Sequence, residues 1–118
     1  MVLVLSQLTG NEVIDRQRAE EYCRYAVCKG KIPISPYLCF QGIFCGEMQD
    51  ILISRLAEKA DEVWVFGPGQ GEERRRKEEE VCQRYGAKAH YFSYPEIGRE
   101  MLVCAMYAEE LSERLEGM

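Results

Sequence analysis

A run of glycines after a short apolar stretch is the part of this sequence best suited to bind a ligand. Residues 67–71 read Gly-Pro-Gly-Gln-Gly and directly follow the β-forming residues 63–66, Val-Trp-Val-Phe. No regular helix or strand tolerates that density of glycine and proline, so the segment is a loop. A loop that leads into a helix can present backbone N–H groups to an anion. Gly67, Gly69 and Gly71 are therefore candidate ligand-binding residues, with a plain tight loop as the alternative.

Two other loops and the start of one helix carry side chains that could complete such a site. The loop 6–11 offers a hydroxyl and a side-chain amide, and the loop 35–42 offers a tyrosine that could stack on a nucleobase. Packing of that tyrosine over the edge of a sheet is the alternative. The candidate ligand-binding residues in these segments are Ser6, Gln7, Gly10, Ser35, Pro36, Tyr37 and Asp50.

The elements that must position these residues alternate along the chain. Apolar or β-branched stretches at 2–5, 32–34, 61–66 and 87–92 predict strands, and Pro33 indicates an edge strand. Helical periodicity follows each strand, over about 12–29, 46–60, 72–85 and from Pro95 onward. This order predicts an α/β fold: a small three-layer, doubly wound parallel sheet of about four strands, Rossmann- or flavodoxin-like, with a C-terminal helix.

The connections of such a sheet bring the candidate residues together. Right-handed crossovers carry every loop that leaves a strand to the carboxyl edge of the sheet. The three loops 6–11, 35–42 and 67–71 therefore gather at one edge, and the first turns of the helix 46–60 begin near it. We expect one cleft there, lined by hydroxyls, backbone amides, a tyrosine and carboxylates.

The buried helix faces are predicted from the same periodicity. In the first helix the expected inward residues are Ala19, Tyr22, Cys23, Ala26 and Val27. In the second helix they are Met48, Ile51, Leu52 and Leu56. In the last helix a continuous stripe is formed by Ile97, Met101, Cys104, Ala105, Ala108, Leu111 and Leu115. Core packing is the first interpretation of that stripe and a dimer surface is the second; Trp64 is expected in the core.

Length and composition limit the class of protein. The chain has 118 residues, is 47% hydrophobic and carries a net charge of −5. We expect one domain over residues 1–118, with 93–118 as a helical extension. The acidic balance argues against nucleic acid as a partner, and no apolar run is long enough to span a membrane. Residues 1–5 are predicted to be a strand and not a signal peptide, which favours a cytoplasmic protein.

The six cysteines do not form a metal-binding pattern. They stand at positions 23, 28, 39, 45, 82 and 104 without a Cys-x-x-Cys pair, and the sequence has a single histidine, His90. Structural zinc needs closer ligand spacing than this. We therefore expect reduced thiols, no metal and no cofactor.

Three blocks of the sequence resemble the nucleoside 2-deoxyribosyltransferase-like family, specifically its short phage and bacterial members. The first block is Ser6-x-x-x-Gly10-Asn11 with the helix segment 18–30 (Arg-Ala-x-x-Tyr-Cys-Arg-Tyr-Ala-Val-x-x-Gly). The second is the segment 33–40, Pro-Ile-Ser-Pro-Tyr-Leu-x-Phe. The third is the segment 56–67, which ends in Asp-Glu-Val-Trp-Val-Phe-Gly, together with Glu78 placed eight residues before Gly86. The blocks cover about residues 1–92.

The resemblance implies a function. Members of the family cleave the N-glycosidic bond of a deoxynucleoside or its monophosphate, using a glutamate in the helix after the third strand. By position that glutamate is Glu78, and an anion suits the oxocarbenium-like centre of such a reaction. The family also implies a homo-oligomer, for which we expect a dimer, and a small-molecule nucleoside or nucleotide as ligand.

Departures from the family pattern keep a second function open. The family's first loop reads Ser-Pro-Tyr-Arg, whereas here Ser6 is followed by Gln-Leu-Thr. The glycine usually found four residues before the glutamate is replaced by Arg74. The alternative is a non-catalytic nucleotide-binding or protein-interaction module that kept the fold and lost the chemistry.

Overall fold

The computed structural model describes residues 1–117. Strands and helices alternate along the chain. The strands are β1 (Val2–Ser6), β2 (Pro33–Ile34), β3 (Glu62–Gly67) and β4 (Ala89–Ser93). The helices are α1 (Glu12–Cys28), α2 (Pro36–Cys39), α3 (Gly46–Lys59), α4 (Glu72–Tyr85) and α5 (Tyr94–Glu116). The short helix α2 lies where the sequence predicts a loop, because Ser35 caps it and Pro36 fits its first turn.

The four strands form one parallel sheet in the order β2-β1-β3-β4. Val2 of β1 is the partner of Pro33 on one side and of Glu62 on the other, and Val63 of β3 is the partner of Ala89 in β4. The predicted α/β class, the parallel sheet and the edge position of the Pro33 strand are confirmed. From β1 the chain continues to β2 at one edge of the sheet, and from β3 it continues to β4 at the other edge. The direction in which strands are added therefore reverses between β1 and β3.

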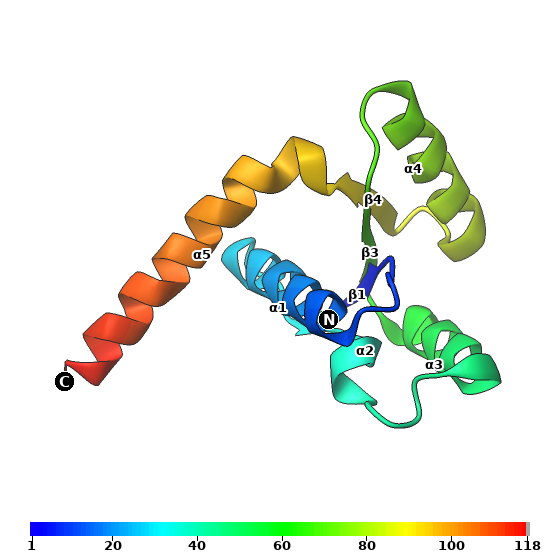
Figure 1. Ribbon diagram of the computed structural model, residues 1–118. Helices are drawn as coiled ribbons and strands as arrows, with labels where there is room; N and C mark the ends of the chain where they lie inside the picture. The colour runs from blue at the N-terminus through cyan, green and yellow to red at the C-terminus, as the bar shows by residue number, and fades with distance from the viewer. Residues whose placement is uncertain (118) are drawn as a thin grey trace.

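Helices cover both faces of the sheet, as Figure 1 shows, with α1 and α5 on one side and α3 and α4 on the other. The α1/α5 face holds an aromatic core in which the Tyr22 ring stacks on Phe66 with centroids 4.3 Å apart. Trp64 is 5% exposed and belongs to the same cluster, as predicted. This packing fixes the roll of α1 relative to β3.

Two predicted helix faces are wrong in part. Val27 is 59% exposed, and Tyr25 is buried instead, because α5 packs on the side of α1 that carries Tyr25. Met48 and Ile51 are also exposed. Only the last turns of α3 pack against the sheet, through Leu56 and the alanines that follow it, so the first turns of that helix have no strand to cover.

Helix α5 leaves the body of the domain. It runs beside α1 at first and then continues away from the sheet to the C-terminus (Figure 1). Ile97, Met101 and Cys104 pack on the aromatic core, whereas Leu111 and Leu115 of the same stripe are exposed. The core interpretation therefore holds for the first half of the stripe only. In the described residues, no helix is long and apolar enough to cross a membrane.

Candidate functional site

A cavity lies at the carboxyl ends of β1 and β3, where the strand order reverses. Open parallel α/β sheets bind ligands at such a switch point. The cavity has a volume of about 340 Å³, and α4 forms one wall. Its lining residues are Leu5, Ser6, Gln7, Ile53, Val65, Phe66, Gly67, Lys77, Glu80, Val81, Arg84, Tyr85 and Tyr91. The size lies within the range of sites for small metabolites.

The ends of the two central strands supply the floor. Ser6 ends β1, and the N–H of Gln7 donates to the carbonyl of Phe66, 3.4 Å away, which holds the start of the loop against β3. Gly67 ends β3 with no side chain, and an added Cβ there would collide with the hydroxyl of Tyr91. Of the candidate ligand-binding residues from the sequence, these three lie together at the switch point.

The face of α4 that lines the cavity carries Lys77, Glu80 and Arg84. These three side chains are spaced three and four residues apart, so they share one side of the helix. None of the three is among the candidate residues predicted from the sequence. The signal was present, since Val81 and Tyr85 pack on the sheet and a helix that buries them turns Lys77 and Glu80 toward the strand ends.

Tyr91 joins β4 to this wall. Its hydroxyl donates to the carbonyl of Pro68, 2.5 Å away, so it fixes the first turn of the glycine loop. Burial, with smaller effects from Tyr94 and from Glu73 and Glu80, raises the pKa of Tyr91 to about 12. The side chain is therefore a neutral hydrogen-bond donor across the physiological pH range.

Glu78, the predicted catalytic carboxylate, does not line the cavity. Its Oε2 accepts a hydrogen bond from the backbone N–H of Tyr91, 2.7 Å away, on the side of β4 that no strand covers. Its other oxygen lies 3.6 Å from Nδ1 of His90, and Arg74 lies 3.7 Å from Oε2. Glu78 stands roughly 200° around the helix from Glu80, because each residue advances the helix by about 100°.

The remaining glycines of the loop face the start of α5. The hydroxyl of Ser93 donates to the carbonyl of Gly69, and the N–H of Gly71 donates to Oε1 of Glu96, 3.2 Å away. The amide that could have bound an external anion is thus taken by a carboxylate of the protein itself. Gly67 is the glycine of this loop that lines the cavity.

The residues predicted from the second loop lie elsewhere. Ser35 caps α2, where its hydroxyl accepts from the N–H of Leu38, 3.4 Å away. Tyr37 packs edge to face against Phe44, with centroids 6.4 Å apart, and lines a separate groove beside the start of α1. Pro36 is buried at the first position of α2. The expected single cleft is therefore divided, and these three residues form no part of the cavity.

Gly10 and Asp50 also lie outside the cavity. The N–H of Gly10 donates to Oδ2 of Asp15, 3.2 Å away. The N–H and the hydroxyl of Thr9 both donate to Oδ1 of Asp15, and each donor atom lies 2.8 Å from that oxygen. Burial alone would raise the pKa of Asp15, but these bonds and the nearby Arg18 outweigh it and hold that pKa below its usual value. Asp50 is exposed on a groove between α3 and α4 that also contacts Tyr85 and Lys88.

The geometry defines a small doubly wound α/β domain with a cavity at the switch point of its sheet, lined by apolar side chains and by the charged residues of α4. The chain belongs to the family described as Domain of unknown function (DUF7768), which it matches over residues 1–92. That match spans β1 to β4 and all the residues of the cavity, and it ends before α5. No curated protein and no solved structure matches the chain.

Proposed function

We propose that this protein binds a nucleoside or a nucleoside monophosphate in the switch-point cavity. The observation that carries the proposal is the position of Lys77, Glu80 and Arg84 beside the ends of β1 and β3. Two cations and one carboxylate give this wall one net positive charge, which favours a phosphate monoester over a neutral ligand. Ser6 and Gln7 offer hydrogen bonds to a sugar or a base at the floor of the cavity.

Cleavage of an N-glycosidic bond in this cavity would use Glu80. Among the residues that line the cavity, it is the one carboxylate. Its oxygen would attack C1′ as the bond to the base breaks, and the departing base would take up a proton from water. Water would then hydrolyse the resulting sugar ester, or a second base would receive the sugar in a transfer.

Binding without catalysis is the second candidate function. Glu78 is the residue that the resemblance selects for catalysis, yet its carboxylate accepts a hydrogen bond from the backbone of Tyr91 at the sheet edge. That hydrogen bond favours binding without catalysis. Either function requires the same cavity, so the two differ only in turnover. The proposal includes a cytoplasmic location, which the free thiols at all six cysteines support.

A thermal-shift titration with deoxynucleosides and their monophosphates tests the binding proposal. A ligand at about a hundredfold excess over its Kd adds about 2.7 kcal/mol to the free energy of unfolding. We expect monophosphates to stabilise the protein more than nucleosides do. Lys77→Gln and Arg84→Gln should each reduce that difference, since they remove the cations that face the phosphate.

Arg75→Gln is the matched control, because Arg75 lies on the side of α4 away from the cavity and the charge change is the same. No stabilisation by any of these ligands would refute the proposal. Release of free base, followed by chromatography, separates the two functions: release that Glu80→Gln abolishes identifies a glycosidase, and binding without release identifies a binding module.

We also propose that the protein forms a homodimer through α5. Residues 101–108 of this helix are apolar without interruption, and only one side packs on α1. A helix that is apolar on all sides is normally buried. The uncovered large side chains are Leu102, Val103, Met106, Tyr107, Leu111 and Leu115. A second copy of the same helix would bury this surface.

A further inference from the structure

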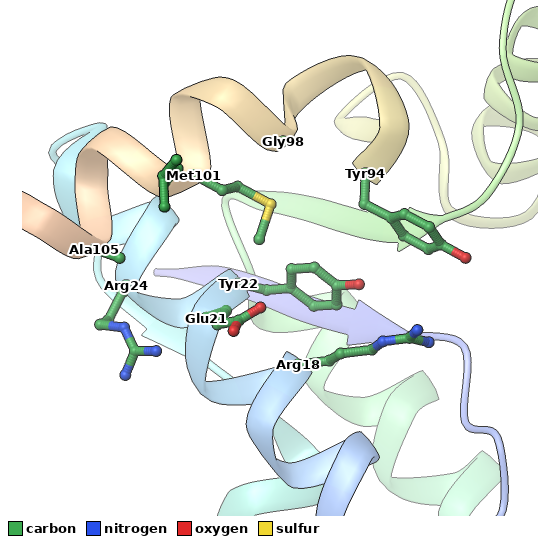
Figure 2. Close-up of a pocket in the computed structure, with 9 residues that line it drawn as sticks. Arg18, Glu21, Tyr22, Arg24, Tyr94, Gly98, Met101 and Ala105 are labelled. Atoms are coloured by element: carbon green, nitrogen blue, oxygen red, sulfur yellow. The ribbon is translucent and has the colours of Figure 1, made fainter.

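A second pocket opens between α1 and α5, on the face of the sheet opposite the switch-point cavity. It has a volume of about 300 Å³. Figure 2 shows the residues that line it: Arg18, Glu21, Tyr22 and Arg24 from α1, and Tyr94, Gly98, Met101, Leu102 and Ala105 from α5. The α1 residues of this pocket lie in the part of the chain that matches the family, and the α5 residues lie beyond it.

One end of the pocket is polar. The hydroxyls of Tyr22 and Tyr94 and the guanidinium of Arg18 extend in the same direction in Figure 2. The guanidinium carbon of Arg18 lies 5.4 Å from the centre of the Tyr94 ring, a cation–π contact that orients the side chain. The stack of Tyr22 on Phe66 fixes the second ring from behind. Three hydrogen-bond donors thus extend toward one end of the pocket, and these contacts hold Arg18 and Tyr22 in position.

Within the described part of the protein, these donors form no hydrogen bond and no ion pair. Among residues 1–117, no carboxylate forms an ion pair with Arg18, and no hydrogen bond engages the hydroxyl of Tyr22, whose residue is only 3% exposed. Buried polar groups are normally hydrogen-bonded. In this part of the chain, every side-chain oxygen or nitrogen that is fully buried has a hydrogen-bond partner. Because the hydroxyl of Tyr22 has none, it must be in contact with open space. That open space is the pocket.

Toward the other end, the α5 wall of the pocket is apolar, with Met101, Leu102 and Ala105, and Arg24 of α1 lies beside Ala105 (Figure 2). The thioether of Met101 extends from α5 toward the ring of Tyr22 in Figure 2. Two arginines and one glutamate line the pocket, so its net charge is one positive. A ligand with one negative charge and an apolar body matches both ends, whereas a dianion would leave charge unbalanced beside Glu21.

Gly98 lies on the wall of this pocket. It lies inside α5 with an ordinary helical backbone, where glycine is less favourable than alanine. An added Cβ at this position would meet no protein atom within 4 Å. Neither backbone conformation nor close packing therefore requires glycine here. Its missing side chain enlarges the pocket midway between the polar and the apolar end.

We propose that the pocket between α1 and α5 binds a small carboxylate with an apolar body. The carboxylate pairs with the guanidinium of Arg18 and accepts hydrogen bonds from the hydroxyls of Tyr22 and Tyr94. The apolar body lies along Gly98, Met101 and Ala105. This site is separate from the proposed nucleotide cavity and does not depend on that proposal, because the two open on different faces of the sheet and share no lining residue.

The test is a titration of the full chain, observed by NMR of the backbone amides and the methionine methyl groups. The probes are benzoate, phenylacetate and hexanoate, each compared with its neutral amide. We expect the carboxylates to bind about tenfold more tightly than the amides, since a hydrogen-bonded charge pair supplies the difference. The signals of Gly98 and Met101 should shift. Equal affinity of acid and amide, or no shift at millimolar probe, would overturn the proposal.

Variants distinguish the polar and the apolar end. Arg18→Gln should weaken benzoate binding about tenfold and leave benzamide binding unchanged. Gly98→Leu fills the pocket and should abolish binding of both probes, while Gly98→Ala adds one methyl group, favours the helix and should weaken binding less. If Gly98→Leu perturbs folding, Gly98→Ala alone decides the point. Full benzoate affinity in Arg18→Gln would refute the assignment.

Lys77→Gln is the matched control for the location of the site. It removes a cation from the switch-point cavity and should leave benzoate affinity unchanged. Loss of benzoate binding in Lys77→Gln with retention in Arg18→Gln would assign the carboxylate to the other cavity and overturn the inference. A lack of nucleotide binding would leave this result unaffected, so failure of the proposed function and failure of this site are distinguishable.

Discussion

Oε2 of Glu78 accepts a hydrogen bond from the backbone N–H of Tyr91, 2.7 Å away, at the open edge of β4. An exposed strand edge presents unpaired N–H and carbonyl groups that can pair with another chain. The carboxylate covers one of these donors. Glu78 is therefore a structural residue of α4 and β4 in this arrangement, and a catalytic function would need it to leave that contact.

Glu78→Ala should lower the free energy of unfolding by about 1 kcal/mol, because it removes a charged acceptor that is partly exposed to solvent. Binding of monophosphates should not change. Glu79→Ala is the matched control, since Glu79 is exposed and both changes replace glutamate by alanine within the same helix. Urea unfolding of the three proteins measures the effect. Loss of base release with unchanged stability in Glu78→Ala would instead support its catalytic function.

Gly67→Ala should destabilise the protein by about 1–3 kcal/mol, a usual cost of overpacking. The new Cβ would collide with the Tyr91 hydroxyl. It would also lie 3.1 and 3.3 Å from the two nearest atoms of the Tyr91 ring. Tyr91→Phe removes the hydroxyl, at the cost of its bond to Pro68. We therefore expect the double variant to be more stable than the sum of the two single effects predicts. Strict additivity would contradict this packing.

Asp15→Asn should destabilise the protein at neutral pH by about 1–3 kcal/mol, because one oxygen that accepts from the 9–10 loop becomes a donor. The pKa of Asp15 is lowered in the folded state, so its contribution is full above the unfolded pKa and is lost as the pH falls through the folded value. The difference from wild type should shrink below about pH 4. Urea unfolding over a pH series, with Glu12→Gln as control, measures it. A difference that grows in acid would contradict this prediction.

Met106→Lys should convert the proposed dimer to a monomer. Met106 is 62% exposed on α5, and a lysine there can pair with Glu110 one turn later, so the helix itself should persist. Analytical ultracentrifugation at micromolar concentration gives the mass. Ser112→Lys adds the same charge at another exposed position of this helix and should leave the dimer intact. A wild-type protein that stays monomeric throughout this range would refute the dimer.

The sheet and its order of elements were predictable because the local signals agree. The apolar stretches 2–5 and 63–66 predict central strands, and the proline in β2 predicts an edge. The start of α5 beside Pro95 and the end of α4 at Gly86 follow from residues suited to helix ends. These features depend on neighbours within a few residues, which a single sequence contains.

The site was predictable in position and less so in detail. Ser6, Gln7 and Gly67 lie at the switch point, as the order of strands implies. Glu80 was harder to distinguish from Glu78, because the run 72–80 is charged at every position and the buried face of α4 is marked only by Val81 and Tyr85 beyond that run. The division of the expected cleft was also hidden, since it depends on the short helix α2 and on the ring of Tyr37 packing against Phe44, seven residues later.

The pairing of the two central strands, β1 and β3, affects how the chain reaches its fold. Val2 of β1 pairs with Glu62 in β3, about sixty positions later. During synthesis β1 therefore emerges long before its main partner, and the first helix has no completed sheet on which to dock. Non-local pairing of this kind slows folding and leaves apolar segments exposed meanwhile. We expect a ribosome-bound chain that stops before β3 to bind chaperones, and one extended past β4 to be released from them.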